Sequence, residues 1–336
     1  MHKQSITDVA VAVFLRTDGS FLLSSRPAGK PYAGYWEFPG GKIEAGESVR
    51  EALRRELIEE LNVAIEEATP WFTFLMHYEH ASVRLHTWRV TRWRDVDAKG
   101  MCGLEGQQFA WQTMRDLTVA PTLPGCGPIF RALALPMRYA ITNATEVGVE
   151  AYLQQLRAAW GINASKAAPN GEFAECISLV PALIQVREKS LPPPALKQFA
   201  TQIVALAREH QAMVLINSDA ALAAEVGADG VHLTSAQLRT LTERPALAWV
   251  GASVHSAEEL QRAGELKCDF AVLGSVKTTQ SHPGMAALGW HAFAAITLDA
   301  PIPVFAIGGM AVVDLPTAIR SGAHGIAMQR QSLNPN

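Results

Sequence analysis

Three glutamates are spaced so that a helix would place them on one face. Glu56, Glu59 and Glu60 stand at i, i+3 and i+4, and a helix with this spacing crowds their carboxylates together. Like charges on neighbouring turns repel one another, and a cation among them offsets that repulsion. Ligands made only of oxygen suit Mg²⁺, with Mn²⁺ as the alternative. Taken alone, the segment is also compatible with a solvated acidic face paired to arginines such as Arg55.

The residues around these glutamates favour a metal and phosphate site. Ser48 and Glu51 form an S-x-x-E capping box, so the spacing predicts a helix that starts just after Ser48. Asn62 follows the helix, and asparagine tolerates the left-handed conformation in which many helices end. Gly40 and Gly41 precede the helix and let the backbone bend and approach phosphates or a metal closely. Together these signals predict a helix whose acidic face holds a metal, preceded by a glycine loop that can approach phosphates.

The first 130 residues combine strand-like runs with this one helix. Such a pattern predicts a compact α+β domain, here over residues 1–132. The strand-like runs are Val9–Leu15, Phe21–Ser24, Trp71–His77 and Val83–Val90, and the helical segment is Ser48–Leu61.

After about residue 137, short β-branched runs alternate with Ala/Leu-rich helical stretches. Eight such units predict a TIM (β/α)8 barrel, an α/β fold, over residues 137–336. A doubly wound sheet is the structural alternative. The eight runs are Arg138–Thr142, Leu183–Arg187, Met213–Asn217, Gly230–Leu233, Trp249–Val254, Phe270–Val276, Val304–Ile307 and Gly325–Met328. The helical stretches include Pro194–Glu209, Ala220–Val226, Ala257–Glu265, Gly289–Ile296 and Leu315–Ser321.

The composition bounds the class of protein. Its 336 residues allow about two domains, and 49% hydrophobic against 18% charged residues exclude a disordered chain. The net charge of −3 gives no basic field for duplex nucleic acid, although single nucleotides stay open as partners. No run approaches about 18 apolar residues, so we expect no membrane span. Four separated cysteines and the lack of an apolar leader predict a reduced, cytoplasmic protein, with its oligomeric state open.

The glycine loop and the acidic helix resemble one family motif. From Gly41 to Val63 the chain follows G-x5-E-x7-R-E-U-x-E-E-x-G-U, with U aliphatic, which is the Nudix box. Asn62 is the one departure, in place of a glycine. Within the Nudix family the chain is most similar to the MutT type, the 8-oxo-dGTP diphosphatases, over roughly residues 5–132. The shared segments are residues 25–26, 36–42 and 104–107, followed by Trp111.

This resemblance implies a nucleoside triphosphate pyrophosphohydrolase that depends on Mg²⁺. Water would attack a phosphorus of the triphosphate, with 8-oxo-dGTP as the first candidate, and release pyrophosphate and a nucleoside monophosphate. Glu56 or Glu59 would take the proton of the water, and the choice between them stays open. The implied metal ligands are Glu56, Glu59, Glu60, Glu105 and the Gly40 carbonyl, and the residues implied beside the substrate are Arg26, Phe38 and Arg55.

One departure leaves the identity of the base open. MutT-type enzymes carry an asparagine near the end of the domain that reads the modified guanine, whereas residues 121–126, PTLPGC, contain none. Thr122 or backbone groups would then recognise a purine triphosphate. ADP-ribose, dinucleoside polyphosphates and damaged pyrimidine nucleotides remain alternatives.

Polar residues also follow several predicted barrel strands, at the end where barrel active sites lie. A Gly-Gly pair after the seventh strand suits a phosphate cradle made of backbone N–H groups. Alone, such a pair can be a plain turn and a loop histidine is more often structural, but their order and spacing together indicate a phosphate site. The candidate binding residues are Arg187, Lys189, Asn217, Thr279, Ser281, Gly308 and Gly309, and His255 follows the fifth strand.

This order resembles the thiamin phosphate synthase/TenI family over about residues 137–330. The synthases bind Mg²⁺ with two aspartates, whereas Ser218 and Gln237 stand at those positions here. The thiazole-phosphate half looks retained, although His282 replaces the usual lysine of its loop. The resemblance therefore implies a TenI-like domain that tautomerises or binds a thiazole phosphate, with His255 as proton shuttle. A synthase fusion, a ligand-sensing barrel, and a thiamin-pathway enzyme that hydrolyses thiamin-type pyrophosphates remain alternatives.

Overall fold

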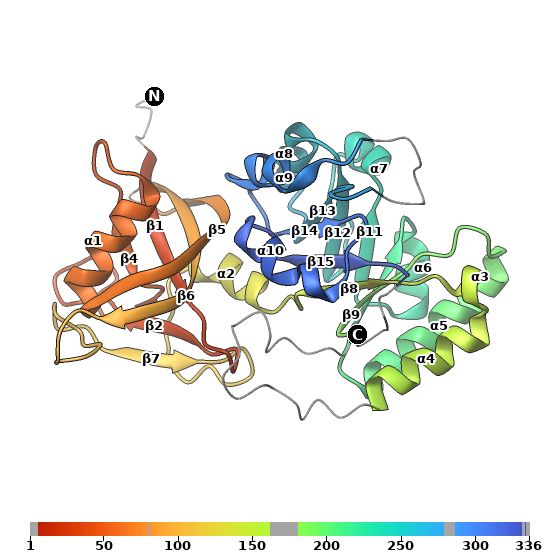
Figure 1. Cartoon of the computed structure of the whole chain (residues 1–336), viewed down its shortest axis with the longest axis horizontal. Coiled ribbons are helices and arrows are strands. Elements are labelled where there is room, and N and C mark those ends of the chain that lie inside the picture. Colours follow the sequence, from red (N-terminus) through yellow and green to blue (C-terminus); the bar gives the residue numbers. More distant parts are fainter. Residues whose placement is uncertain (1–5, 80, 162–180, 279–285, 331–332, 334–336) are drawn as a thin grey trace. The chain divides into compact units, whose positions relative to one another are not determined.

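The chain folds as two compact units, Met1–Ala134 and Leu135–Asn336 (Figure 1). The computed structural model describes residues 6–79, 81–161, 181–278, 286–330 and 333. Within these residues, no helix combines the length and the apolar character that crossing a membrane requires.

The first unit is an α+β fold, which confirms the predicted class. Its strands are β1 (Ile6–Phe14), β2 (Phe21–Ser25), β3 (Trp36–Glu37), β4 (Gly40–Lys42), β5 (Val63–His77), β6 (Ser82–Asp95) and β7 (Phe109–Gln112), and its helices are α1 (Val49–Leu61) and α2 (Cys126–Leu133). One sheet has the order β4-β1-β6-β5 and the other the order β3-β2-β7. Strand β1 runs parallel to β6 and antiparallel to β4, so the short glycine strand lies directly beside the centre of the larger sheet.

Helix α1 is closed at both ends by side chains. The predicted capping box is confirmed, since Ser48 accepts the Glu51 N–H and the Glu51 carboxylate accepts the Ser48 N–H. Asn62 ends the helix at φ 60°, in the left-handed region, and its Nδ2 donates to Asp97 Oδ1 at 2.8 Å and to the Gly100 carbonyl at 3.0 Å. Asparagine therefore contributes two side-chain hydrogen bonds at this position, which a glycine could not make. The buried face of the helix consists of Ala52, Leu53, Leu57 and Leu61.

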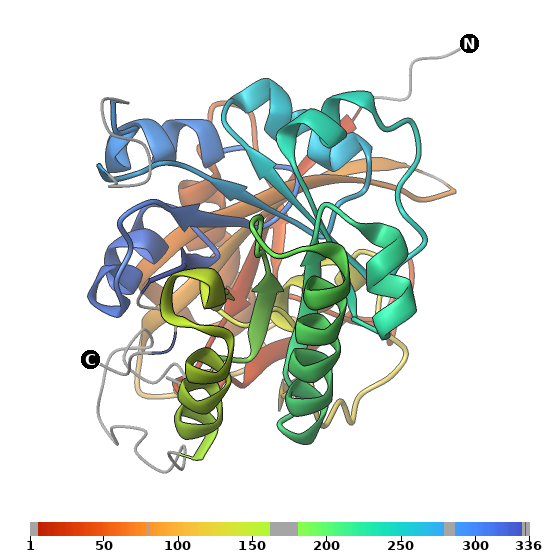
Figure 2. The same cartoon turned by 90° about the vertical axis from the view of Figure 1, so that its right-hand side faces the viewer.

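The second unit is a closed barrel of parallel strands with helices around it (Figures 1 and 2). Its described strands are β8 (Arg138–Ile141), β9 (Leu183–Val186), β10 (Met213–Asn217), β11 (Gly230–Leu233), β12 (Trp249–Val254), β13 (Phe270–Leu273), β14 (Val304–Ile307) and β15 (Gly325–Met328). Strands that follow one another in the chain pair with one another, and β15 pairs with β8 to close the circle. The predicted TIM barrel is confirmed, and the doubly wound sheet is excluded because its strand order would reverse.

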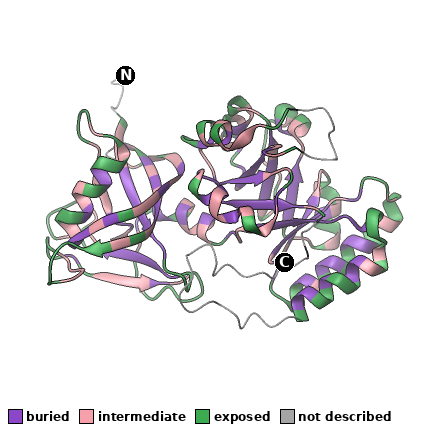
Figure 3. Cartoon of the chain, viewed as in Figure 1, coloured by how far each residue is buried: buried purple, intermediate pink, exposed green. Residues whose placement is uncertain are grey.

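The helical elements of this unit lie between the strands in the chain, and every α-helix among them has buried residues, whereas the 3-10 turn has none (Figure 3). They are α3 (Ala144–Val147), α4 (Val149–Gly161), α5 (Pro193–Glu209), α6 (Ala220–Val226), α7 (Ser235–Thr240), α8 (Ala257–Glu265), α9 (Gly289–Thr297), the 3-10 turn η2 (Val312–Asp314) and α10 (Leu315–Arg320).

Side chains fill the interior of the barrel. The rings of Tyr139, Phe270 and Phe305 pack with centroids 5.3 to 5.7 Å apart. Beside them, His232 contacts the Tyr139 hydroxyl through Nδ1 at 3.2 Å and the Ser253 hydroxyl through Nε2 at 2.9 Å. Because this layer is packed, a ligand can reach the barrel only at its ends.

Candidate functional site

Strand β4 lies so close to its neighbours that side chains are excluded at Gly40 and Gly41. Gly40 has φ +140°, and a Cβ at this position would overlap the backbone oxygen of Ala10. A Cβ at Gly41 would overlap the Glu56 carboxylate. The two glycines therefore let helix α1 place a carboxylate directly against the backbone of the strand.

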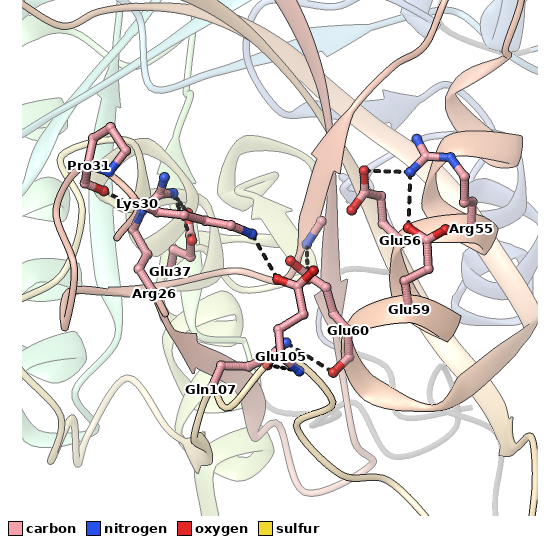
Figure 4. Close-up of polar contacts among 11 residues, drawn as sticks. Arg26, Lys30, Pro31, Glu37, Arg55, Glu56, Glu59, Glu60, Glu105 and Gln107 are labelled. Carbon is pink, nitrogen blue, oxygen red and sulfur yellow. Dashed lines mark hydrogen bonds and ion pairs between the residues drawn. The ribbon is translucent and has the colours of Figure 1, made fainter. Parts of the chain in front are cut away.

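Arg55 holds two of the predicted metal ligands (Figure 4). Its Nη1 donates to Glu56 Oε1 at 2.8 Å and to Glu59 Oε2 at 3.3 Å. The rest of the guanidinium is fixed by Glu47, at 2.8 and 3.0 Å, and by the Lys42 carbonyl at 3.0 Å. This contact with Arg55 lowers the pKa of Glu47 to about 2. Glu47 and the Lys42 carbonyl thus hold Arg55 independently of the Glu56 and Glu59 carboxylates, and Arg55 sets the orientation of both.

Glu60 is a largely enclosed member of the predicted ligands. Its Oε2 accepts the Gly40 N–H at 3.3 Å. Burial raises its pKa to about 7, and the nearby Glu56 and Glu37 carboxylates act in the same direction. A carboxylate in such surroundings is stabilised in its charged form by a nearby cation.

Glu105 lies on the segment between β6 and β7 and is paired with Lys30 (Figure 4). Lys30 Nζ donates to Glu105 Oε2 at 2.8 Å, and this contact raises the pKa of Lys30. Gln107 secures the segment, because its Oε1 accepts the Glu105 N–H at 2.8 Å and its Nε2 donates to the Glu60 carbonyl at 3.0 Å. The backbone around Glu105 is therefore tied to the end of helix α1.

The four carboxylates have separate partners: two pair with Arg55, one with a backbone N–H and one with Lys30. In the described part of the chain, no three His, Cys, Asp or Glu side chains form a ready metal cluster. The residues present nevertheless fit a hard divalent cation. Every donor is an oxygen, and one carboxylate is buried among like charges. The metal site remains a prediction. In it, a bound ion would replace the resident cations, Arg55 and Lys30, as the positive charge beside the carboxylates.

The residues predicted to lie beside the nucleotide occupy different environments. Arg26 Nη1 donates to both carboxylate oxygens of Glu37, at 2.8 and 2.6 Å. Burial raises the pKa of Glu37, while the Arg26 charge opposes the shift. The Phe38 ring is buried, with centroids 5.7 Å from Phe21 and 5.6 Å from Phe130, so it supports the site from the core.

Three residues of this region were missed by sequence reasoning. Lys30 belongs to an ion pair between distant segments, for which a single sequence gives no signal. Tyr78 and Cys126 lie near Glu37, whose charge acts on both of them. Burial raises the pKa of Cys126 to about 12, so its thiol stays neutral.

In the barrel, the positions where the synthases carry aspartates hold neutral groups that are already bonded. Gln237 closes the capping box of α7 with Thr234, and its Nε2 donates to the Ser218 carbonyl at 2.7 Å. Asn217 accepts from Gln185 Nε2 at 3.0 Å and donates to the Ser218 hydroxyl at 3.2 Å. This side of the barrel mouth therefore offers hydrogen bonds and no carboxylate at these two positions.

His255 is exposed at the end of β12 with one ring nitrogen engaged. Its Nδ1 lies 3.2 Å from the Gly274 carbonyl, and its backbone N–H donates to Glu259 Oε2 at 2.8 Å. A carbonyl oxygen can only accept, so Nδ1 carries the proton in the neutral ring and Nε2 is the basic nitrogen.

The predicted phosphate cradle lies after β14. Gly308 has φ +103° and Gly309 has φ +63°, and a Cβ at Gly308 would overlap Ser275. Lys277, which sequence reasoning missed, lies against Gly309, and its Nζ contacts Asp314 Oδ1 at 2.5 Å. Of the other predicted residues, Arg187 is partly exposed and Lys189 exposed, while Thr279 and Ser281 lie outside the described residues.

Comparisons with known proteins assign the two units to two families. Residues 6–131 match the model of the NUDIX domain, and residues 166–331 match that of thiamine monophosphate synthase, TMP-TENI. The CTP pyrophosphohydrolase of Escherichia coli (strain K12) is 36% identical over 125 residues, which cover 36% of this chain and 87% of that protein. The thiamine-phosphate synthase of Chlorobium phaeobacteroides is 34% identical over 150 residues, which cover 44% of this chain and 73% of that protein.

One solved structure comes from a study of MutT of Aliivibrio salmonicida and Vibrio cholerae. Its chain is 28% identical in sequence to this one, with a TM-score of 0.32, and the match covers 38% of this chain and 97% of the solved chain. The two sequence matches lie in different halves of the chain, so the expected fusion is confirmed. The chain therefore belongs to the Nudix hydrolases over its first unit and to the thiamine monophosphate synthase (TMP-TENI) family over its second.

Proposed function

We propose that the first unit is a Mg²⁺-dependent nucleoside triphosphate pyrophosphohydrolase whose preferred substrate is 8-oxo-dGTP. The observation that carries the proposal is the placement of Glu56 against Gly41, with Glu59 and Glu60 on the same helix. Hydrolysis is supported by the family, and a nucleotide substrate by the relative named as a CTP pyrophosphohydrolase. The purine is supported by the MutT-type segments of the sequence.

The residues of the site take separate roles in this proposal. Glu56, Glu59, Glu60 and Glu105, with the Gly40 carbonyl, would hold the ion, and Mn²⁺ would serve in place of Mg²⁺ because all donors are oxygens. A bound ion supplies charge neutralisation at the phosphates and a lowered pKa of water. Glu56 or Glu59 accepts the proton of the attacking water, and Arg55 keeps both carboxylates in place.

The base would lie near the Arg26–Glu37 pair, which is close to Tyr78 and Cys126. Cys126 offers only a neutral thiol, whose Sγ donates to the Trp36 carbonyl at 3.7 Å, and a thiol is a weak hydrogen-bond donor. Without an asparagine in residues 121–126, discrimination of the oxidised guanine would depend on backbone groups and on Glu37. We therefore expect activity on several nucleotides in addition to 8-oxo-dGTP.

A substrate screen tests this proposal. The full chain is assayed with Mg²⁺ on 8-oxo-dGTP, dGTP, CTP and thiamin pyrophosphate, and total phosphate is measured after inorganic pyrophosphatase is added. The highest kcat/KM is expected for 8-oxo-dGTP. A higher value for CTP would keep the hydrolase and reject the purine, and a higher value for thiamin pyrophosphate would favour the thiamin-pathway alternative.

For the second unit, we propose a domain that binds a thiazole phosphate and tautomerises it. The absence of carboxylates at Ser218 and Gln237 removes the synthases' anchors for Mg²⁺, whereas Gly308, Gly309 and Lys277 suit a phosphate monoester. The basic Nε2 of His255 would shuttle the proton, because its partner Nδ1 is fixed at the Gly274 carbonyl.

Two variants separate binding from catalysis in this barrel. Lys277→Met is expected to weaken the binding of thiazole phosphate about tenfold by calorimetry, the size of one charge-assisted contact. His255→Ala should keep the affinity within about twofold and lower tautomerase turnover by at least about 100-fold. Lys197→Met, which removes an exposed lysine paired with Glu225, is the charge control. Binding without turnover in the wild type would instead support a sensing barrel, and no binding would reject the proposal.

A further inference from the structure

Lys30 is the resident cation of the first site that has the fewest attachments. Its Nζ contacts Glu105 Oε2 at 2.8 Å, and no second hydrogen bond of this ammonium group occurs among the described residues. The charge of Glu60 also acts on Lys30 and helps to raise its pKa. Arg55, the other cation, is fixed by Glu47 and by the Lys42 carbonyl as well as by its two ligand carboxylates. Lys30 is therefore the cation that can leave.

The backbone that carries Lys30 is held at its base. Between β2 and β3, the Arg26 N–H donates to the Tyr35 carbonyl at 2.8 Å, and the Gly34 N–H donates to the Arg26 carbonyl at 3.0 Å. Arg26 Nε also donates to the Pro31 carbonyl at 2.8 Å, beside Lys30 itself (Figure 4). The loop is thus closed, and any movement of the ammonium group falls to the flexible four-carbon side chain.

The ion pair itself is exposed enough to be exchanged. The side chain of Lys30 is 47% exposed and that of Glu105 is 44% exposed. Ion pairs of this exposure are weakened by water and by salt. A divalent cation carries twice the charge of an ammonium group and competes for the same carboxylate oxygen.

We propose that Lys30 is a built-in counter-ion, which neutralises Glu105 until a divalent cation takes that carboxylate and which then binds the triphosphate of the nucleotide. The inference rests on the proposed function, because it takes Glu105 as a metal ligand. The exchange keeps both partners satisfied, since the released ammonium group gains phosphate oxygens, which are strong acceptors for lysine. Loading of metal and loading of nucleotide are then linked through one side chain.

The first test is metal binding without nucleotide. Lys30→Met is expected to bind Mn²⁺ about three- to tenfold more tightly than the wild type at low ionic strength, because the competing cation is gone. The affinity is measured from the electron paramagnetic resonance of free Mn²⁺ during a titration of the full chain. Lys99→Met is the matched control, since Lys99 is an exposed lysine of the same unit without an ion pair to the four carboxylates.

The second measurement follows the nucleotide. Lys30→Met is expected to raise KM for 8-oxo-dGTP about tenfold and to change kcat less, and Lys30→Arg is expected to restore KM in part. Equal Mn²⁺ affinities in wild type and Lys30→Met, or equal shifts in Lys30→Met and Lys99→Met, would overturn the counter-ion while leaving the metal site intact. Failure of all these proteins to bind Mn²⁺ would instead overturn the metal site of the proposed function, and the counter-ion with it.

Discussion

Glu59→Gln is expected to lower kcat for pyrophosphate release from 8-oxo-dGTP by about 100- to 10,000-fold, the range that loss of a general base or of a ligand charge produces. The Glu59 side chain is 56% exposed and bonded to Arg55 at 3.3 Å, so a glutamine can keep a hydrogen bond there. Glutamine is also a good helix former. The loss should therefore appear in turnover, with little change in the stability of the fold.

The control for this prediction is Glu66→Gln, the same chemical change at a residue of β5 whose carboxylate lies 3.7 Å from Arg92 Nε. It should retain the turnover of the wild type. Unchanged turnover in Glu59→Gln would remove this residue from the catalytic set.

The same measurement on Glu56→Gln addresses the choice that the sequence leaves open. Glu56 lies against Gly41, whereas Glu59 is more exposed, so the two glutamates have different surroundings. The residue that acts as the base contributes the acidic limb of the pH profile of kcat/KM. The variant that removes this limb identifies the base, and a variant that lowers kcat/KM at every pH identifies a ligand.

Elements that are specified by local rules could be predicted from the sequence to within a residue or two. Helix α1 starts after Ser48 because the capping box is local, and it ends at Asn62 because the left-handed conformation is local too. In the barrel, Met213–Asn217, Trp249–Val254 and Val304–Ile307 were predicted with the bounds that the structure has. Each of these runs is short, apolar and bounded by turn residues, and that length with those flanking residues is typical of a fully buried strand in a parallel sheet.

The misses have physical causes that no local pattern contains. Strands β3 and β4 have two and three residues, too few for a periodicity, and they exist because they pair with β2 and β1. Strand β5 begins at Val63, whereas the sequence predicted a start at Trp71. The first part of the strand was missed because register shifts around Glu67 and Pro70 break the alternation of buried and exposed side chains on which the prediction depends. The predicted run Phe270–Val276 was too long, since β13 ends at Leu273 and Val276 already donates to the Ile307 carbonyl in the loop.

The residues of the candidate site also fall into two groups, those that local spacing predicts and those that depend on tertiary contacts. Helical spacing was enough to put Glu56, Glu59 and Glu60 on one face. It was not enough to find the counter-ion of Glu105, because Lys30 and Glu105 are 75 residues apart in the chain. Charge pairing between distant loops depends on the tertiary fold, and a single sequence without aligned relatives carries no trace of it.

The second large effect concerns His232, whose proton balance links the stability of the barrel to pH. In the folded barrel, burial and, to a smaller extent, the Arg187 charge lower the pKa of His232 to about 3, from an ordinary value of 6.5. Between about pH 6.5 and pH 3, His232 is therefore protonated in the unfolded chain and neutral in the folded barrel. The free energy of unfolding should fall by about 1.4 kcal/mol per pH unit in the window from about pH 6.5 down to about pH 3, an upper bound for one group.

His232→Gln removes this link while keeping a neutral side chain that can bond Tyr139 and Ser253. We expect the variant to be less stable than the wild type at pH 7.5, by about 1 to 2 kcal/mol for imperfect hydrogen bonds. Between pH 6.5 and pH 5 the titration of His232 lowers the free energy of unfolding of the wild type by about 2 kcal/mol, and the variant lacks this loss. The difference in the free energy of unfolding between the two proteins should therefore shrink or reverse at pH 5. Urea unfolding followed by pulsed alkylation of Cys268, which is buried in the barrel unit, reports this unit separately from the first. His291→Gln, at an exposed histidine of α9, should retain the pH slope of the wild type, and the same slope in His232→Gln would show that the buried imidazole is not the group that titrates.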